Sequence, residues 1–290
     1  MEKRYFIFGV NGMAGHVIAQ YLKEKGCHVT GFARRESRIC KTIIGDARDR
    51  TDIECALRTA GEYDAVINCI GVLNKYVDEY LSDGIYLNSV LPHILAEKLK
   101  NTETKLIHIS SDCIYEGTRG QYTEKDFPDA TSYYGRTKAL GEVIDDKNLT
   151  IRTSIVGPEL KTNGIGLFHW FMNQDGPVEG YKKVIWTGVT TLQLAKAIEA
   201  DAYSRQTGLY HLVNNETICK YDLLKLFNKH CRKNPVEIRK NNIVVSDKSV
   251  LNTQEIITFP VPSYEEMVWE MADWVRKHPE LYGQYKESIK

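Results

Sequence analysis

The sequence lacks any grouping of cysteine and histidine that would hold a metal ion or a disulfide framework. Its seven cysteines contain no Cys-x-x-Cys pair, and their number is odd. Scattered cysteines, several of them inside apolar runs, are typical of reduced, buried thiols in a cytosolic protein. No His/Cys/Asp cluster has metal-ligand spacing, so neither a structural nor a catalytic metal is expected.

The sequence also lacks an excess of charge and a long hydrophobic run. Lys plus Arg number 38 and Asp plus Glu number 38, so the formal net charge is zero. A balanced chain does not favour nucleic acid as its main partner. The longest apolar stretch, residues 65–73, is far shorter than the roughly 20 residues that span a bilayer. Because the chain enters a strand-like run at once, without a signal peptide, we expect a cytoplasmic protein that binds neither nucleic acid nor a membrane.

Short apolar strands alternate with helical segments over the first part of the chain. Strands that are almost wholly apolar and separated by helices indicate a parallel sheet covered on both faces. The predicted strands are residues 4–8, 28–33, 42–44, 65–68, 105–110 and 149–153. The predicted helices are residues 14–25, 80–99 and 132–144. The fold class is therefore α/β, with a Rossmann-type doubly wound parallel sheet.

A glycine motif follows the first predicted strand and opens the first helix. Its pattern is Gly-x-x-Gly-x-x-Gly. Glycines there permit a tight turn and a close approach to a pyrophosphate, while the helix N-terminus supplies N–H donors. A plain turn is the alternative. The residues expected to bind a dinucleotide here are Gly9, Asn11, Gly12, Met13 and Gly15.

The end of the second strand indicates which dinucleotide is bound. A carboxylate there would hold the ribose 2′-OH of NAD, but the chain has Arg34 and Arg35. Guanidinium groups suit a 2′-phosphate, so we expect NADP(H) rather than NAD(H), with Arg34 the better candidate. Two solvated surface arginines are the alternative.

Asn88 is expected to be a buried polar tether for a neighbouring strand. The further cofactor contacts expected are Asp46, Ala47, Cys69, Ile70 and Gly71.

Tyr134 and Lys138 stand four residues apart in a predicted helix and therefore share one face of it. A neighbouring positive charge stabilises a phenolate and lowers the pKa of the phenol from its usual value of about 10. Such a tyrosine can exchange a proton with a carbinol or ketone oxygen. Ligands bind beyond the carboxyl ends of parallel strands. A hydroxyl of Ser110 or Ser111, at the end of the fifth strand, can therefore hydrogen-bond the same oxygen.

These motifs together resemble the extended short-chain dehydrogenase/reductase family and, within it, the dTDP-4-dehydrorhamnose reductase group of sugar-nucleotide reductases. The likeness covers nearly the whole chain. The segments that carry it are 9–15, 110–112, 116–117, 122–124, 134–138, 141–142, 152–154, 186–191 and 249–253. The last two favour this group over the epimerases and dehydratases of the same superfamily.

The resemblance implies NADPH-dependent reduction of a keto group on a nucleotide-linked deoxysugar, in surface polysaccharide or deoxysugar biosynthesis. Tyr134 would donate the proton, and Lys138 would hold the nicotinamide ribose and lower the pKa of the tyrosine. Ser111 would bind the carbonyl oxygen and stabilise the developing alkoxide. Asp112 and Glu124 would shape the sugar pocket. Dimers are common in the superfamily, so a homodimer is the assembly that the resemblance implies.

The regular alternation stops after residue 157, and a smaller α/β substrate lobe is expected there. We predict an NADP-binding domain over residues 1–157 and a substrate lobe over residues 158–290, with strands near 184–190 and 208–213 crossing back to the sheet or lying beside it. Further helices are predicted at 167–173, 191–202, 221–229 and 264–277, with a strand at 236–239. The candidate diphosphate partners are Lys182, Lys183 and Arg239. Rings that either stack on the base or belong to the core are Phe168, Trp170 and Phe171.

Two positions depart from the pattern of the reductase group. The group usually has an aromatic residue after Ser-Thr-Asp and a tryptophan after Arg-Thr-Ser, where this chain has Cys113 and Ile155. Both positions face the sugar in the family. The pocket is therefore expected to be less aromatic, and the sugar need not be the usual 4-keto-6-deoxymannose. Cys113 is expected to be a pocket-lining or buried thiol rather than a nucleophile.

Two other functions stay open at this point. A nucleotide-sugar epimerase or dehydratase would reduce NADP transiently and return the hydride, without net consumption of NADPH. A non-catalytic NADP-binding regulatory subunit, a role found among close relatives of the group, would keep the fold without turnover. The intact set of Ser111, Tyr134 and Lys138 argues against the second of these.

Overall fold

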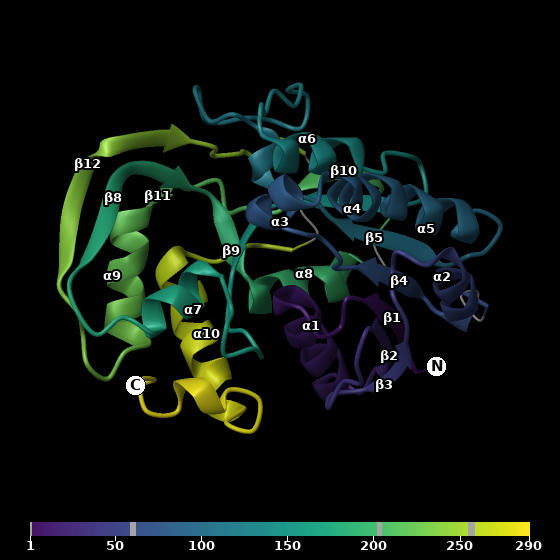
Figure 1. The fold of residues 1–290 in the computed structure, drawn as a ribbon, viewed down its shortest axis with the longest axis horizontal. Coiled ribbons are helices and arrows are strands. Elements are labelled where there is room, and N and C mark those ends of the chain that lie inside the picture. The colour runs from purple at the N-terminus through teal and green to yellow at the C-terminus, as the bar shows by residue number, and fades with distance from the viewer. Residues whose placement is uncertain (1, 59–61, 202–204, 255–258) are drawn as a thin grey trace.

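Seven parallel strands form the central sheet of the protein, in the order β10-β6-β5-β4-β1-β2-β3 (Figure 1). The structure is a computed structural model that describes residues 2–58, 62–201, 205–254 and 259–290. The strands of this sheet are β1 (Arg4–Phe8), β2 (His28–Ala33), β3 (Lys41–Ile44), β4 (Ala65–Asn68), β5 (Lys105–Ile109), β6 (Leu149–Arg152) and β10 (Gly208–His211). The expected α/β fold with a Rossmann-type sheet is confirmed. The strand order reverses at β1, next to β4, and such a switch point is where these sheets bind ligands.

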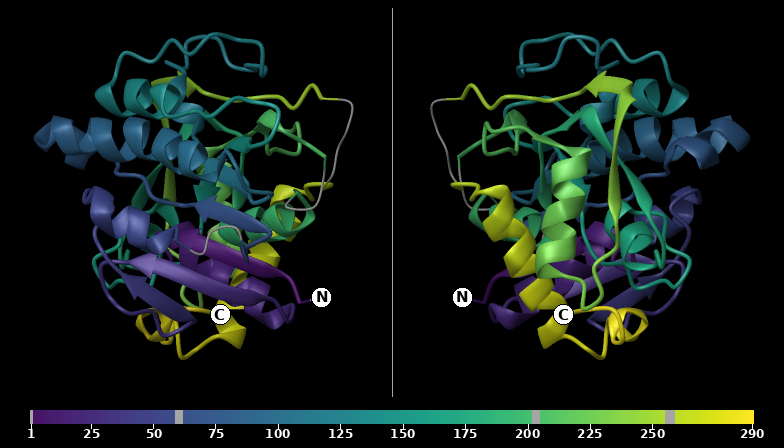
Figure 2. Two further views of the ribbon diagram at one scale, coloured as in Figure 1. Left: turned by 90° about the vertical axis from the view of Figure 1, so that its right-hand side faces the viewer. Right: turned by 90° about the vertical axis from the view of Figure 1, so that its left-hand side faces the viewer.

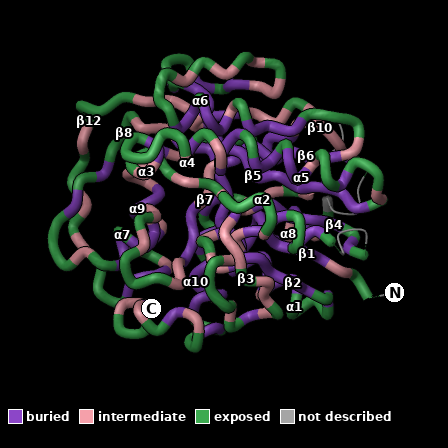
Figure 3. The backbone as a smooth tube through the Cα atoms, turned by 45° about the vertical axis from the view of Figure 1, so that its right-hand side comes forward, coloured by how far each residue is buried: buried purple, intermediate pink, exposed green. Residues whose placement is uncertain are grey.

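The side chains of β1 alternate between two hydrophobic cores, because successive residues of a strand point to opposite faces. Tyr5 and Ile7 pack into the core that also contains residues of α1 and α8, whereas Phe6 and Phe8 pack into the core that contains residues of α2 and α5. All four side chains are fully buried, and Figure 3 shows that the central strands are mostly buried. The bounds of these helices are α1 (Met13–Glu24), α2 (Arg50–Ala56), α5 (Leu91–Leu99) and α8 (Thr191–Asp201).

The long helix predicted over residues 80–99 is confirmed from Leu81 to Leu99, with a π-helical turn inside it. It consists of α4 (Leu81–Ile85), the π-helical turn (Tyr86–Val90) and α5, and a short separate helix, α3 (Asn74–Glu79), precedes it. Pro92, the second residue of α5, has no N–H to donate to the carbonyl four residues earlier, that of Asn88. The chain widens there, and the N–H of Leu91 donates to the Tyr86 carbonyl five residues back.

Two further helices differ from the prediction. The helix predicted at 132–144 is α6 (Tyr133–Leu140), which ends before Gly141, where a Cβ would lie 1.9 Å from the carbonyl oxygen of Asn88. Helix α2 was not predicted, although Asp49 caps it by accepting a hydrogen bond from the Thr51 N–H at 2.8 Å. The predicted end of the helix at 191–202, Ala202, lies outside the described residues.

A second, three-stranded sheet lies beside the main sheet, in the order β11-β8-β12. Helix α9 packs on β8, and the right-hand view of Figure 2 shows α9 in green at the front. Two short strands, β7 and β9, pair with each other between the two sheets. The elements of this region are β7 (Ser154–Val156), α7 (Leu167–Met172), β8 (Val178–Trp186), β9 (Gly188–Thr190), β11 (Ile218–Cys219), α9 (Lys220–His230), β12 (Ile238–Asp247), α10 (Tyr264–Lys277) and a 3-10 turn (Gly283–Tyr285). Within the described ranges, no helix is both long enough and apolar enough to cross a membrane.

Candidate active site

The glycine loop between β1 and α1 requires glycine at two of its positions. Gly9 has a φ of +79°, in the left-handed region that favours glycine. A Cβ on Gly15 would lie 2.2 Å from the carbonyl oxygen of Gly9, so any larger residue would open the turn. Gly12 is the N-cap residue of α1, and no side chain accepts a hydrogen bond from the first N–H groups of this helix. The N-terminus of α1 is therefore available to a ligand, as the binding of a pyrophosphate requires.

Arg34 and Arg35 follow β2 directly and lie next to this loop. The side-chain amide of Asn11 donates to the carbonyl of Arg35 at 2.9 Å, which joins the glycine loop to the end of β2. Both arginines are exposed, and neither guanidinium forms an ion pair with a carboxylate of the described residues. Their charges are therefore available to a phosphate placed beside the glycine loop.

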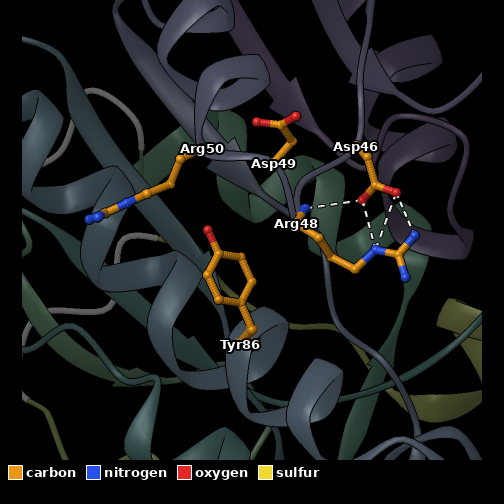
Figure 4. A pocket seen from close by; sticks show the side chains of 5 residues that line it. All are labelled: Asp46, Arg48, Asp49, Arg50 and Tyr86. Carbon is orange, nitrogen blue, oxygen red and sulfur yellow. Dashed lines mark hydrogen bonds and ion pairs between the residues drawn. The ribbon is translucent and has the colours of Figure 1, made fainter.

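Asp46, at the carboxyl end of β3, belongs to a pocket that is lined by charged residues (Figure 4). Its carboxylate accepts a hydrogen bond from Arg48 Nη2 at 2.6 Å, and this bond is the main cause that lowers the pKa of Asp46. Arg48 Nη1 also pairs with Asp83 at 2.9 Å. The expected contact of Asp46 with the cofactor stays a prediction, and in this structure the carboxylate already has a strong partner. The residues lining the pocket are Asp46, Arg48, Asp49, Arg50 and Tyr86.

The loop after β4 lies between the glycine loop and α6, the helix that carries Tyr134 and Lys138. Ile70 lies beside Gly9, since a Cβ on that glycine would be 3.1 Å from Ile70 Cγ1. A Cβ on Gly71 would be 3.8 Å from Lys138 Nζ. Asn88 holds this loop by accepting from the Val72 N–H at 2.9 Å and donating to Thr137 of α6 at 3.2 Å. The expected tether is confirmed, although Asn88 holds the loop after the strand rather than the strand itself.

The remaining predicted cofactor residues lie close to the same edge of the sheet. Cys69 directly follows β4, and its N–H donates to the carbonyl of Phe8, the last residue of β1, at 3.0 Å. Ala47 is buried in the core that contains Phe8, so only its backbone can reach a ligand. The side chain of Met13 lies next to Gly166, where a Cβ would be 3.1 Å from the sulfur. The glycine loop after β1, the loop after β3 and the loop after β4 therefore lie along one edge of the sheet.

Lys138 is buried and donates from Nζ to the carbonyl oxygen of Ile109 at 2.8 Å. Burial lowers the pKa of Lys138 to about 8, while the Glu142 carboxylate opposes that shift. Tyr134 is also buried, and its burial raises the pKa of the phenol, with a smaller opposing contribution from a hydrogen bond with Ser111. The expectation that Lys138 lowers the pKa of Tyr134 is therefore corrected for this structure, because burial dominates. A protonated phenol is the form that can donate a proton.

Ser111, rather than Ser110, faces the tyrosine. Ser111 caps a 3-10 turn (Asp112–Ile114) by accepting a hydrogen bond from the Cys113 N–H at 3.1 Å, and its hydroxyl is near enough to Tyr134 to oppose the rise in the pKa of that phenol. Ser110 Oγ instead donates to Glu142 Oε1 at 2.7 Å. The two adjacent hydroxyls therefore have separate roles, one in the candidate site and one in the structure beneath it.

A buried ion pair lies beneath the site and was not recognised from the sequence. Arg152 Nε and Nη2 donate to the two carboxylate oxygens of Glu142 at 2.7 and 2.6 Å, and each side chain is 3% exposed. Arg152 Nη1 also donates to the Tyr115 hydroxyl at 2.7 Å. Because Ser110 bonds the same carboxylate, this network fixes the ends of β5 and β6 relative to α6.

Asp112 and Cys113 form the wall of the candidate site next to Ser111. Asp112 is 5% exposed, and burial raises the pKa of its carboxyl group against the charge of Lys220. Burial raises the pKa of Cys113 to about 12. The thiol is therefore neutral, which agrees with the expectation that Cys113 is no nucleophile. Lys220, from the second sheet region, was not predicted, and a lone lysine at a helix start carries no sequence signal.

The other predicted substrate residues have structural partners. Glu124 accepts a hydrogen bond from Thr253 Oγ1 at 2.7 Å, and Ile155 pairs with Val189 between β7 and β9. Lys182 is exposed on β8 and pairs with Asp222 at 2.6 Å. Their roles in substrate binding stay predictions. Two of the three candidate stacking rings, Phe168 and Phe171, are fully buried core residues, whereas Trp170 is partly exposed. The other two candidate diphosphate partners, Lys183 and Arg239, are exposed.

The comparisons with known proteins agree with the resemblance. The family model of the RmlD substrate binding domain matches residues 3–275. The probable low-salt glycan biosynthesis reductase of Haloferax volcanii is 34% identical over 161 residues, which are 52% of this chain and 53% of that protein. The methionine adenosyltransferase 2 subunit beta of Rattus norvegicus is 24% identical over 77% of this chain and 70% of its own length.

The fold is also that of a solved reductase. The structure of dTDP-4-dehydrorhamnose reductase from Bacillus anthracis, in complex with NADP, aligns with a TM-score of 0.78 and 16% identity, over 93% of this chain and 98% of that chain. The alignment with the Haloferax protein spans about half of that protein's length. The family match, in contrast, covers nearly the whole chain. The protein therefore belongs to the RmlD substrate binding domain family.

Proposed function

We propose that the protein is an NADPH-dependent oxidoreductase that reduces a keto group on a nucleotide-linked deoxysugar. The observation that carries this proposal is the convergence of Ser111, Tyr134 and Lys138 at the edge of the sheet that also holds the glycine loop. The names of two similar proteins support it, since one is a glycan biosynthesis reductase and the other a dTDP-4-dehydrorhamnose reductase. The cofactor would lie on residues 1–157, and most of the substrate would lie on residues 158–290.

The side chains present fit such a reduction. Bound NADPH would supply the hydride. Ser111 Oγ and the Tyr134 hydroxyl, which lie near each other, would both hold the carbonyl oxygen. Tyr134 would donate its phenolic proton to that oxygen as negative charge develops there. The Lys138 ammonium, close to Gly71 in the cofactor loop, would bind the nicotinamide ribose and stabilise the phenolate that remains.

The function can be tested by mixing the purified protein with NADPH and a panel of nucleotide-linked 4-keto-6-deoxysugars. Net, stoichiometric loss of NADPH absorbance with at least one sugar, together with a reduced sugar product, is the expected result. An epimerase or dehydratase would convert a sugar without net loss of NADPH. If no member of the panel caused NADPH oxidation above a no-sugar control, the reductase proposal would fail.

A second candidate is a regulatory subunit that binds the cofactor without turnover. The observation that favours it is the similarity to methionine adenosyltransferase 2 subunit beta over 77% of this chain. The same assay separates the two functions, because a regulatory subunit would bind NADPH tightly without oxidising it in the presence of any sugar. Ser111, Tyr134 and Lys138 would then have no catalytic use, and their joint burial at the cofactor edge favours the enzyme.

The preference for NADP(H) over NAD(H) is part of this proposal. Replacing Arg34 with aspartate removes a cation beside the glycine loop and places an anion where the 2′-phosphate would lie. We expect Arg34→Asp to weaken NADPH binding by about 10- to 100-fold, the range for a lost charged hydrogen bond, and NADH binding by less than about threefold. Fluorescence titration with both cofactors measures the difference.

Arg38→Asp is the matched control, because Arg38 is exposed in the same loop and the change in charge is the same. An equal loss of NADPH affinity in both variants would show a general effect of charge. No loss in Arg34→Asp would remove Arg34 from the phosphate site.

A further inference from the structure

His16 lies in the first turn of α1, and its side chain is fully buried. Its Nδ1 atom lies 2.8 Å from the carbonyl oxygen of Gly12, and its Nε2 atom lies 3.0 Å from the hydroxyl oxygen of Tyr282. Trp274 Nε1 donates to the same hydroxyl at 3.0 Å. Tyr282 belongs to the C-terminal segment (residues 278–290), which follows α10 and is yellow in Figure 1. A chain of hydrogen bonds therefore joins this segment to the glycine loop.

The chemistry of these groups fixes the direction of each hydrogen bond. A carbonyl oxygen only accepts, so His16 Nδ1 carries a proton and donates it to Gly12. Burial lowers the pKa of His16 to about 4, so the ring is neutral near pH 7 and its Nε2 atom accepts. An indole N–H only donates, so the Tyr282 hydroxyl accepts from Trp274 and gives its own proton to His16. Every polar atom of the three side chains then has a partner.

The carbonyl of Gly12 sets the direction of the N–H group in the same peptide unit, that of Met13. It accepts from the backbone N–H of His16 at 3.1 Å as well as from Nδ1. A trans peptide unit is planar, and its C=O and N–H bonds point in opposite directions. Because two donors of α1 hold the carbonyl, the N–H of Met13 points out of the helix N-terminus, where a pyrophosphate binds. Hydrogen bonds to the carbonyl also polarise the peptide unit and strengthen its N–H as a donor.

A second tyrosine of the C-terminal segment holds a loop against the same residue. The N–H of Glu159 donates to the Tyr285 hydroxyl at 3.2 Å, and the N–H of Gly166 donates to Glu159 Oε1 at 2.7 Å. Gly166 lies next to Met13, where a Cβ would be 3.1 Å from the sulfur. The C-terminal segment therefore acts on Met13 twice, on its backbone through Tyr282 and on its side chain through Tyr285.

The C-terminal segment also contacts the last residue of α1, Glu24. His278 Nε2 lies 2.5 Å from Glu24 Oε1, and His278 Nδ1 lies 2.7 Å from the carbonyl oxygen of Trp274. Tyr282 is thus bonded to the first turn of α1 and His278 to the last. These contacts fix the cofactor helix along its axis relative to α10.

We propose that Tyr282 is a positioning residue of the cofactor site, which acts through His16 and aims the Met13 N–H at the pyrophosphate of the bound dinucleotide. The inference rests on the cofactor that the proposed function requires, but it concerns binding and not turnover. Tyr282 is 1% exposed, so it acts without touching the cofactor. It lies 266 residues after His16 in the chain, in the lobe that was expected to hold the substrate. The cofactor site therefore depends on both lobes.

The first experiment measures the affinity of Tyr282→Phe for NADPH by fluorescence titration, without any sugar. We expect an affinity about 3- to 10-fold lower than that of the wild type, the range for one lost hydrogen bond. The affinity for adenosine 2′-monophosphate, measured by displacement of NADPH, is expected to stay within about twofold, because this fragment has no pyrophosphate. A general loosening of the domain would weaken both ligands alike.

Tyr264→Phe is the matched control. Tyr264 is a buried tyrosine of α10 whose hydroxyl donates to the Glu216 carbonyl at 2.6 Å, and not to a residue of α1. The variant loses the same hydroxyl group and one hydrogen bond. We therefore expect a lower melting temperature together with the NADPH affinity of the wild type.

A double-mutant cycle tests whether Tyr282 acts through His16. His16→Phe keeps an aromatic ring and removes both hydrogen bonds of the imidazole. We expect it to lower the NADPH affinity by about 3- to 10-fold, as Tyr282→Phe does. Adding Tyr282→Phe to His16→Phe is expected to cause no further loss, because the connection to Gly12 is already broken.

Three results would overturn the inference: wild-type NADPH affinity in Tyr282→Phe, an equal loss for both ligands, or losses that add in the double variant. If Tyr282→Phe does not fold, as judged by thermal melting, His16→Phe takes its place in the comparison of the two ligands. If the wild type binds NADPH but reduces no ketosugar, the reductase proposal fails, while a selective loss of NADPH affinity in Tyr282→Phe still supports the positioning role. A wild type that bound neither NADPH nor NADH would overturn both.

Discussion

Replacing Tyr134 with phenylalanine is expected to lower kcat for ketosugar reduction by about 10²- to 10⁴-fold, the usual contribution of a positioned acid. The phenol is buried, and burial raises its pKa, so the group holds its proton until the carbonyl oxygen gains charge. Phenylalanine keeps the ring and its packing but cannot donate the proton. Because the proposed contact with the nicotinamide ribose is made by Lys138 and not by Tyr134, the affinity for NADPH is expected to change by less than about twofold. Steady-state kinetics and a separate cofactor titration measure both quantities.

Tyr133→Phe is the matched control for this prediction. Tyr133 is the neighbouring residue on α6, its side chain is 49% exposed, and it loses the same hydroxyl. We expect its kcat to equal that of the wild type. A parallel fall of kcat and NADPH affinity in Tyr134→Phe would instead indicate that the tyrosine supports the structure of the site.

Replacing Arg152 with methionine is expected to reduce the free energy of unfolding by about 3–5 kcal/mol, the range for a buried ion pair that loses one partner. The change leaves the Glu142 carboxylate buried beside Ser110 without its two strongest donors. It also removes the donor to the Tyr115 hydroxyl. Urea denaturation followed by circular dichroism measures the loss.

Two further variants test whether the loss of stability in Arg152→Met is specific to a buried ion pair. Lys98→Met breaks the exposed pair of Lys98 with Glu54 and is expected to cost no more than about 1 kcal/mol. The double variant Arg152→Met with Glu142→Met removes both buried charges and is expected to regain much of the stability, because no uncompensated charge is left. A loss in Arg152→Met no larger than in Lys98→Met would contradict the role given to the buried pair.

Local sequence patterns were sufficient for most of the fold. Helix α10 occupies the predicted residues 264–277, because its apolar residues recur with helical spacing and Ser263 caps it by accepting from the Glu266 N–H. The central strands lie within one or two residues of their predicted bounds, since each is a short apolar run between turn residues. The helix predicted over residues 80–99 forms from Leu81 to Leu99, but the π-helical turn before Pro92 was not predicted, although the missing N–H of that proline was a local signal.

The direction in which the pKa of Tyr134 shifts could not be predicted from local sequence patterns. The spacing of Tyr134 and Lys138 correctly indicated a shared helix face, but it suggested a lowered tyrosine pKa. In the structure the lysine donates to the Ile109 carbonyl, and burial of the phenol raises its pKa. Burial depends on what the rest of the chain packs over a residue, and no spacing within α6 contains that information.

The sequence by itself determined the order of strands and helices, the glycine turn and the residue types available for proton transfer, because these depend on neighbours within a few residues. Only the tertiary structure decided that Ser111 faces Tyr134 while Ser110 bonds Glu142. It alone brought Glu142 and Arg152 together as a buried ion pair beneath the site. Such choices arise where segments far apart in the chain meet, since packing there sets which side chains are desolvated and which charges act on each other.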